Sequence, residues 1–229
     1  MRKLFFVALV AVLSLTLGFG VAFAANSKFS AHVKDLVIVE DATSQAWTTV
    51  LNAAIKTPNK KDLLIGASFE TGIYTRTKVK GKSGDPLTAS AEGNLQVRIL
   101  IDGVATKVLP KAVTYDYRKQ TLNAVLGGVI EQCTCTVNPL TGTCTIIVDD
   151  NCDVTDEEIE LILDTMAAHH FNFVARDLES GDHTVEVQVS ISSSTNGDAT
   201  ATVTVGNGSL TVEEVRAINQ DGGIVFEMD

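Results

Sequence analysis

Apolar and polar residues alternate with a period of two in many short runs along this chain, and this pattern constrains the fold most. In the run 183–192, for example, Val185, Val187 and Val189 alternate with polar neighbours. Alternation at this period places the apolar side chains on one face of an extended strand. The sequence therefore predicts strands at 47–55, 62–75, 95–101, 121–129, 143–148, 171–176, 183–192, 199–205 and 210–218.

Short polar segments separate these runs, at 57–61, 80–86, 193–198 and 206–208. Glycine, proline, asparagine and serine end strands because they adopt turn conformations or bond to local backbone. Asp102-Gly103, after the run 95–101, is a hairpin-turn signal. Many short strands with polar turns predict an all-β, antiparallel two-sheet sandwich. We favour jelly-roll-like over immunoglobulin-like connectivity because the chain exceeds an ordinary seven-strand module.

One segment favours a helix instead. Thr155 and Glu158 have the spacing of a capping box, in which each side chain bonds to the backbone of the other residue. Apolar residues then recur at helical spacing, at Ile159, Ile162, Leu163 and Met166. These features predict one short helix over 156–168, covering an end or an edge of the sandwich.

The first 24 residues have the features of a secretory signal peptide. Arg2 and Lys3 precede a largely apolar stretch, and Ala22-Phe23-Ala24 supplies a small-x-small cleavage site. No second apolar run of membrane-spanning length follows. We therefore expect cleavage of residues 1–24, no membrane insertion afterwards, and a single β-sandwich domain over 25–229, secreted to the extracellular space or the periplasm.

The chain is acidic, with 18 Lys and Arg against 28 Asp and Glu and a net charge of −10. Signal removal takes away Arg2 and Lys3 and no acid, so the remaining protein is more acidic still. A field of this sign repels the phosphates of nucleic acids and of anionic membranes, and excludes both as expected partners.

The four cysteines, Cys133, Cys135, Cys144 and Cys152, fall within twenty residues. In an exported protein, a clustered even set predicts disulfide bonds. The turn-forming residues 138–142 favour a Cys135–Cys144 bridge nested inside a Cys133–Cys152 bridge, and the other two pairings stay open. The spacing fits no common zinc site.

An acidic segment overlaps this cluster. Asp149, Asn151, Asp153 and Glu160 fall at positions one, three, five and twelve of an EF-hand calcium loop. Val154, however, stands where that loop needs glycine. The favoured interpretation is acids at a helix N-terminus, with no cofactor; a calcium site is the alternative.

Tyr115 and Tyr117 would share one face of an extended strand. Aromatic rings on one face could stack against sugars, so this pair is the candidate carbohydrate platform.

No nucleophile elbow, metalloprotease motif or phosphate-binding loop occurs in the chain. The leading hypothesis is a secreted, non-catalytic β-sandwich that acts in extracellular binding or assembly. Its partners would be an extracellular protein or glycan, or further copies of itself in a homo-oligomer. The alternative is an extracellular polysaccharide hydrolase or lyase with paired carboxylates.

Overall fold

The computed structural model describes residues 28–35, 38–40, 46–58, 60–146 and 152–215, and all the regular structure among them is β-strand. The prediction of an all-β antiparallel sandwich is confirmed, and the predicted signal peptide lies outside the described residues. The strands are β1 (Phe29–Lys34), β2 (Ile38–Glu40), β3 (Thr48–Thr57), β4 (Lys61–Gly81), β5 (Pro86–Ile101), β6 (Val108–Leu109), β7 (Val113–Val125), β8 (Val129–Cys133), β9 (Thr136–Val137), β10 (Cys144–Thr145), β11 (Cys152–Thr155), β12 (Glu157–Leu178), β13 (Gly181–Asn196) and β14 (Asp198–Val215).

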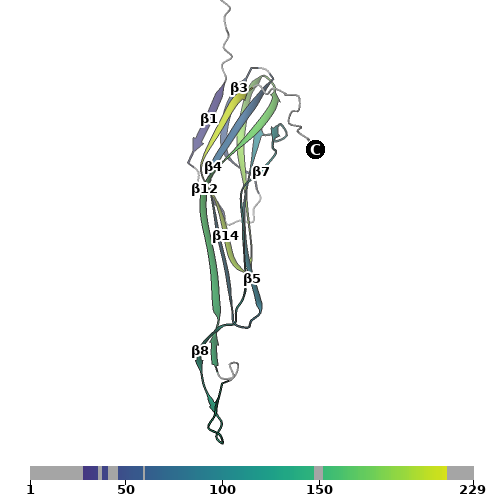
Figure 1. Cartoon of the computed structure of the whole chain (residues 1–229). Coiled ribbons are helices and arrows are strands. Elements are labelled where there is room, and N and C mark those ends of the chain that lie inside the picture. The colour runs from purple at the N-terminus through teal and green to yellow at the C-terminus, as the bar shows by residue number, and fades with distance from the viewer. Residues whose placement is uncertain (1–27, 36–37, 41–45, 59, 147–151, 216–229) are drawn as a thin grey trace, which may run out of the picture.

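Two long sheets form the sandwich. One has the strand order β1-β14-β4-β12-β6, with β2 also paired to β14, and the other has the order β3-β13-β5-β7. The molecule is elongated, and a narrow extension carrying β8 projects from the end opposite β1 and β3 (Figure 1). At about 3.4 Å per residue, the 21 residues of β4 span roughly 70 Å. The choice of jelly-roll-like connectivity stays a prediction.

Several predicted strands prove to be parts of longer ones. The runs 199–205 and 210–215 are both in β14, and the glycines between them form an irregularity in the ladder between Val205 and Gly208 instead of a turn. A Cβ atom on Gly208 would lie 2.5 Å from the ring of Phe69. Glycine is needed there because the ring of Phe69 packs directly against the backbone.

The inner faces of the two sheets enclose two apolar clusters. The larger includes the fully buried side chains of Phe69, Phe173, Leu63, Leu95 and Val203, and the smaller consists of Val79, Ala89 and Leu126. Between them along β4 lie Thr75 and Thr77, which are 0% exposed, opposite the buried Gln120 of β7. A polar layer therefore divides the core.

The predicted helix over 156–168 is wrong, because Asp156 directly precedes β12 and residues 157–168 form the first half of that strand. Glu157 pairs with Gly81, and the register then runs without a break to Ala175 opposite Leu63. Thr155 does not cap a helix; it belongs to β11, and its hydroxyl donates to the Glu131 carboxylate. A helix here would leave this side of β4 without a pairing strand, which explains why sheet pairing prevails over local propensity.

The Asp102-Gly103 turn is formed as predicted, with positive φ values of 53° and 78°. The Asp102 carboxylate accepts a hydrogen bond from the backbone N–H of Thr184 at 2.8 Å and lies 2.8 Å from Nδ1 of His183. Nε2 of His183 lies 2.9 Å from the carbonyl oxygen of Glu179. A protonated ring donates to both acceptors, so these hydrogen bonds raise the pKa of His183 above 6.5. Burial disfavours the charged form of Asp102, but bonds from His183 and Thr184 outweigh it and lower its pKa below 3.8.

We expect this pair to make stability depend on pH. A raised pKa in the folded protein means that protonated His183 stabilises the fold fully at pH values below its unfolded pKa, and that this contribution is lost as pH rises through the folded pKa. Ionised Asp102 stabilises the fold at pH values above its unfolded pKa. Because its folded pKa is lowered, this contribution is lost only as pH falls through that folded pKa, in strong acid. Urea unfolding of the wild type and of His183→Gln should therefore differ more at about pH 5 than at about pH 9. An equal difference at both pH values would contradict the assignment.

Candidate functional site

The outer side of β12 is an open sheet edge. On one side β12 pairs with β4 along nearly its whole length, whereas on the other it pairs only with β6, at Val174 and Ala175. Among the described residues, no strand pairs with this outer side between Glu157 and Phe173. Figure 1 shows this part of β12 along one margin of the molecule. We call residues 157–173 the β12 edge.

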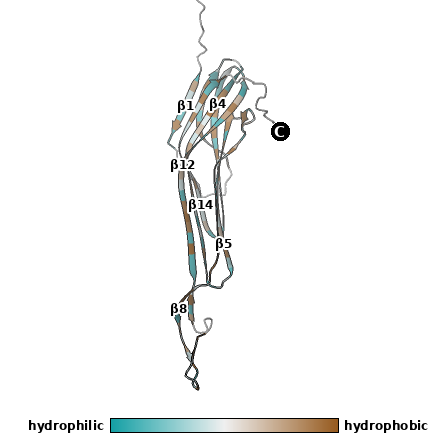
Figure 2. Cartoon of the chain, in the orientation of Figure 1, coloured by the Kyte–Doolittle hydropathy of each residue, from teal (hydrophilic) through white to brown (hydrophobic). Residues whose placement is uncertain are grey.

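Large apolar side chains are exposed on both faces of the β12 edge. Odd-numbered residues of β12 pair with buried, odd-numbered residues of β4, so their side chains lie on the inner face of the sheet. The side chains of even-numbered residues lie on its outer face. The exposed inner-face residues are Ile159, Leu161, Leu163 and Phe171, and those of the outer face are Ile162 and Met166. Met166 is the most open, at 77% exposure. Hydrophobic segments recur along β12 in Figure 2.

The backbone of the β12 edge has a defined orientation. The carbonyl oxygens of Ala67 and His169 both lie within 3.0 Å of the Tyr115 hydroxyl, which also accepts from the backbone N–H of Phe69. Odd-numbered peptide groups of β12 therefore face β4. Because peptide groups alternate in direction along an antiparallel strand, the N–H and C=O groups of even-numbered residues from Glu158 to Asn172 face the open side.

A β-bulge in β7 decides where its side chains point. The pairing with β5 shifts between Leu95 and Gln96, so that Tyr115 is an extra residue in the ladder. Tyr115 is buried, its ring lies edge-on to the rings of Phe69 and His169, and burial raises the pKa of its phenol to about 12. Tyr117 is 52% exposed on the other face. The predicted carbohydrate platform of Tyr115 and Tyr117 is therefore wrong.

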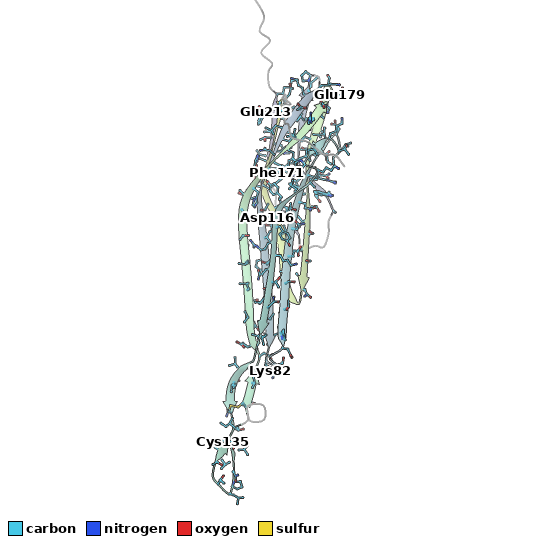
Figure 3. The ribbon with its side chains drawn as sticks, turned by 45° about the vertical axis from the view of Figure 1, so that its right-hand side comes forward. Lys82, Asp116, Cys135, Phe171, Glu179 and Glu213 are labelled. Carbon is cyan, nitrogen blue, oxygen red and sulfur yellow. A yellow bond between two sulfur atoms is a disulfide. The ribbon has the colours of Figure 1, made fainter. Side chains whose placement is uncertain are left out.

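After the bulge, Asp116, Arg118 and Gln120 of β7 point inward and bond to residues of β4 and β12. Asp116 is labelled in Figure 3. The amide nitrogen of Gln120 donates to the carbonyl oxygen of Leu161 at 2.8 Å and to the Thr77 hydroxyl at 2.7 Å. Arg118 bonds to the carbonyl oxygen of Ile73 at 2.6 Å and to the Thr165 hydroxyl. β12 is thus fixed from beneath as well as by its pairing with β4. The open edge is held in strand geometry without a second strand beside it.

Three ion pairs neutralise the acidic start of β12. Lys78 lies 2.6 Å from Glu158, Lys80 lies 3.8 Å from Asp156, and Arg76 pairs with Glu160. All three pairs are partly exposed to solvent, which screens the charges and limits their contribution to stability. Their main effect is on the local electrostatic potential. The cations of β4 compensate carboxylates that would otherwise repel an approaching acidic chain.

The candidate calcium ligands fall in different places. Asp149 and Asn151 lie outside the described residues, Asp153 is in β11, and Glu160 is in β12. The carboxylate of Glu160 is occupied by Arg76. Within the part of the chain that the structure describes, no group of three or more metal-binding side chains is found. The calcium site stays a prediction.

The extension beyond the sandwich is closed by two disulfides. Cys133 is bonded to Cys152 and Cys135 to Cys144, which is the nested arrangement (Figure 3). Almost every described residue of the extension is exposed, and Leu140 at its turn is 94% exposed. Covalent bridges take the place of a buried core in so small a unit. A hollow of about 910 Å³ lies where the extension joins the sandwich, beside Lys82.

Loss of the Cys135–Cys144 bridge should affect the extension alone. In the chain-entropy model, a short loop closure contributes about 2 to 3 kcal/mol, here to a hairpin far from the buried clusters. For the double variant Cys135→Ser, Cys144→Ser, we expect faster hydrogen exchange at 134–146 and an unchanged thermal transition of the sandwich. A lower transition temperature would show that the hairpin and the sandwich unfold together.

The polar layer should be necessary for the position of β12. Gln120→Leu leaves the hydroxyls of Thr75 and Thr77 and the carbonyl of Leu161 without their partner, so we expect a loss of about 1 to 3 kcal/mol in the free energy of unfolding. Thr121→Leu, on the exposed face of the same strand, is the matched control and should change stability by less than about 0.5 kcal/mol. Equal stability of the two variants, measured by urea unfolding, would refute this role.

The sequence did not reveal the β12 edge, because Ile159, Ile162, Leu163 and Met166 also fit helical spacing. The signal that could have found it is the alternation of Ile159, Leu161 and Leu163, which continues the period of two found elsewhere.

Comparisons with known proteins assign no family. No family model and no curated protein matches the chain. A solved structure of infectious bursal disease virus, Gx strain, aligns with 8% identity and a TM-score of 0.15, over 82% of this chain and 40% of the viral chain. The chain thus spans less than half the length of that protein. The described residues include no helix that is long and apolar enough to span a membrane.

Proposed function

We propose that this protein is a secreted, non-catalytic β-sandwich that acts in extracellular assembly, and that the β12 edge accepts a strand from another polypeptide. The observation that carries the proposal is an open edge of about 17 residues with apolar side chains on both faces. Backbone hydrogen bonds supply affinity when a strand adds to such an edge, and alternating side chains supply specificity.

The lack of protection on the β12 edge supports this proposal. Soluble proteins block exposed edges with lysine, proline or bulges. Residues 157–173 contain no lysine, arginine, proline or glycine, and their pairing with β4 has no bulge. The edge strand of the other sheet, β7, has a bulge at Tyr115 and carries Arg118 and Lys119. On the opposite edge of that sheet, β3 contacts β1 through His32 and Asn52.

The extension and its bridges are compatible with this function. Two disulfides suit an oxidising environment outside the cytoplasm. The strands run along the long axis of the molecule, so a strand added at β12 would form a contact along that axis (Figure 1).

A proline substitution at the edge tests the proposal. Met166→Pro removes an N–H that faces the open side, which edge strands tolerate, and should block strand addition. Met166→Thr removes the same side chain but keeps the N–H, and is the matched control. We expect light scattering on the exported, purified protein to give a mass above one chain for the wild type and Met166→Thr, and one chain for Met166→Pro.

Circular dichroism should show that both variants keep the strand content of the wild type. A wild-type mass of one chain at high micromolar concentration would contradict assembly. A multimer that persists in folded Met166→Pro would show that assembly uses another surface.

A further inference from the structure

We infer that the strand added at the β12 edge is β12 of a second copy of this chain, paired antiparallel about a two-fold axis at Thr165. This inference rests on the proposed function and names its partner. Two-fold axes are the commonest symmetry of protein oligomers, and they require that one surface patch complement itself. The β12 edge meets this requirement in three respects: backbone, length and charge.

The backbone permits self-pairing. Even-numbered residues of β12 direct their peptide groups outward, so the open side offers alternating donors and acceptors from Glu158 to Asn172. An axis perpendicular to the sheet keeps the inner face of one copy level with the inner face of the other. Even-numbered residues of one copy then stand opposite even-numbered residues of the other. Each peptide group that faces outward in one copy therefore meets an outward-facing peptide group of its partner.

The length of the edge selects the register. Pairing can begin at Glu157, where β12 starts, and must stop before Val174, where β6 occupies the outer side. The midpoint of this open stretch is Thr165. A two-fold axis there is the only position that uses the whole edge in both copies, because any other centre leaves unpaired residues at one end or collides with β6.

Charge favours the same antiparallel arrangement. The first half of the edge contains Glu157, Glu158, Glu160 and Asp164, whereas residues 165–172 contain no acid and include His169 and His170. Antiparallel pairing places each acidic half beside an acid-free half. With the axis at Thr165, Glu160, whose carboxylate already bonds to Arg76, stands opposite His170, so no acid meets an acid at this position. An axis one residue earlier would place Asp164 against its own copy, and like charges in that position are destabilising.

Side-chain size is complementary in this register as well. Leu163 stands opposite Ala167 and Ile162 opposite Ala168, so that a large side chain meets a small one in each pair. Ile159 stands opposite Phe171, which gives an aliphatic–aromatic pair. Such cross-strand pairs each contribute up to about 1 kcal/mol. All of these side chains are exposed in the single chain. Self-pairing would bring each of them into contact with a cross-strand neighbour and reduce its exposure to water.

Cysteine crosslinking tests the register. The described native cysteines are all in disulfides, so a new thiol reports on its own position. Odd-numbered residues form the close, non-hydrogen-bonded pairs of this dimer, in which a disulfide can form between opposite positions. We expect mild oxidation to convert most of Thr165→Cys to a covalent dimer, and to leave Leu163→Cys and Ala167→Cys largely uncrosslinked when each is oxidised alone. A mixture of Leu163→Cys with Ala167→Cys should crosslink, and this pair leaves the bond from Arg118 to Thr165 intact.

The outcomes separate the two proposals. Self-crosslinking strongest at Leu163→Cys or at Ala167→Cys would overturn the register. Absence of every crosslink in a protein whose multimer is abolished by Met166→Pro would overturn self-pairing of β12 and retain assembly at this edge. A wild-type protein that is a single chain at high micromolar concentration would overturn both.

Discussion

The antiparallel pairing of β4 with β12 is the interaction on which the rest of the structure depends. β4 lies between β14 and β12, and both ladders run most of the length of the molecule. One continuous strand thus fixes the register of both neighbours. The sheet so formed supplies one wall of both apolar clusters. A shift of one residue along β4 would turn Phe69 and Ile73 out of the core, so burial and register fix each other.

The polar layer between the clusters links the two sheets. Gln120, Arg118 and Asp116 of β7 point toward the other sheet and bond to hydroxyls and carbonyl oxygens of β4 and β12. Buried amide and hydroxyl groups are tolerated because each is hydrogen-bonded. These bonds are directional, whereas apolar contacts are not. The layer therefore specifies how β7 lies against the other sheet, a relation that apolar packing alone would leave less defined.

The sequence predicted the parts of the fold that depend on local pattern. Alternation identified parts of the long strands β3, β4, β5, β7, β12, β13 and β14 but not β1, β2 or β6, and Asp102-Gly103 identified its turn. The helix prediction failed because Ile159, Ile162, Leu163 and Met166 fit two periodicities, and the choice between them was made by β4, far away in the chain. The tyrosine platform failed because a bulge reverses the alternation after Tyr115, and a bulge has no reliable sequence signature. Pairing partners and bulges arise from contacts between distant segments, which a linear pattern does not contain.

The apolar residues of β12 fit both helical and strand spacing, and they are also exposed in the folded chain. Both properties have one origin. A strand buried on one face alternates strictly, whereas residues 157–168 carry apolar groups on both faces, so Ile162 and Met166 mask the alternation of Ile159, Leu161 and Leu163. Within one chain, the second set of apolar groups has nothing to cover it. Self-pairing would place cross-strand neighbours beside these groups and would also consume the open edges of both copies, because a two-fold contact is closed. An edge that would otherwise recruit chains without limit would then end in a defined dimer, and this proposed dimer would account for the lack of the lysines and prolines that protect other edges.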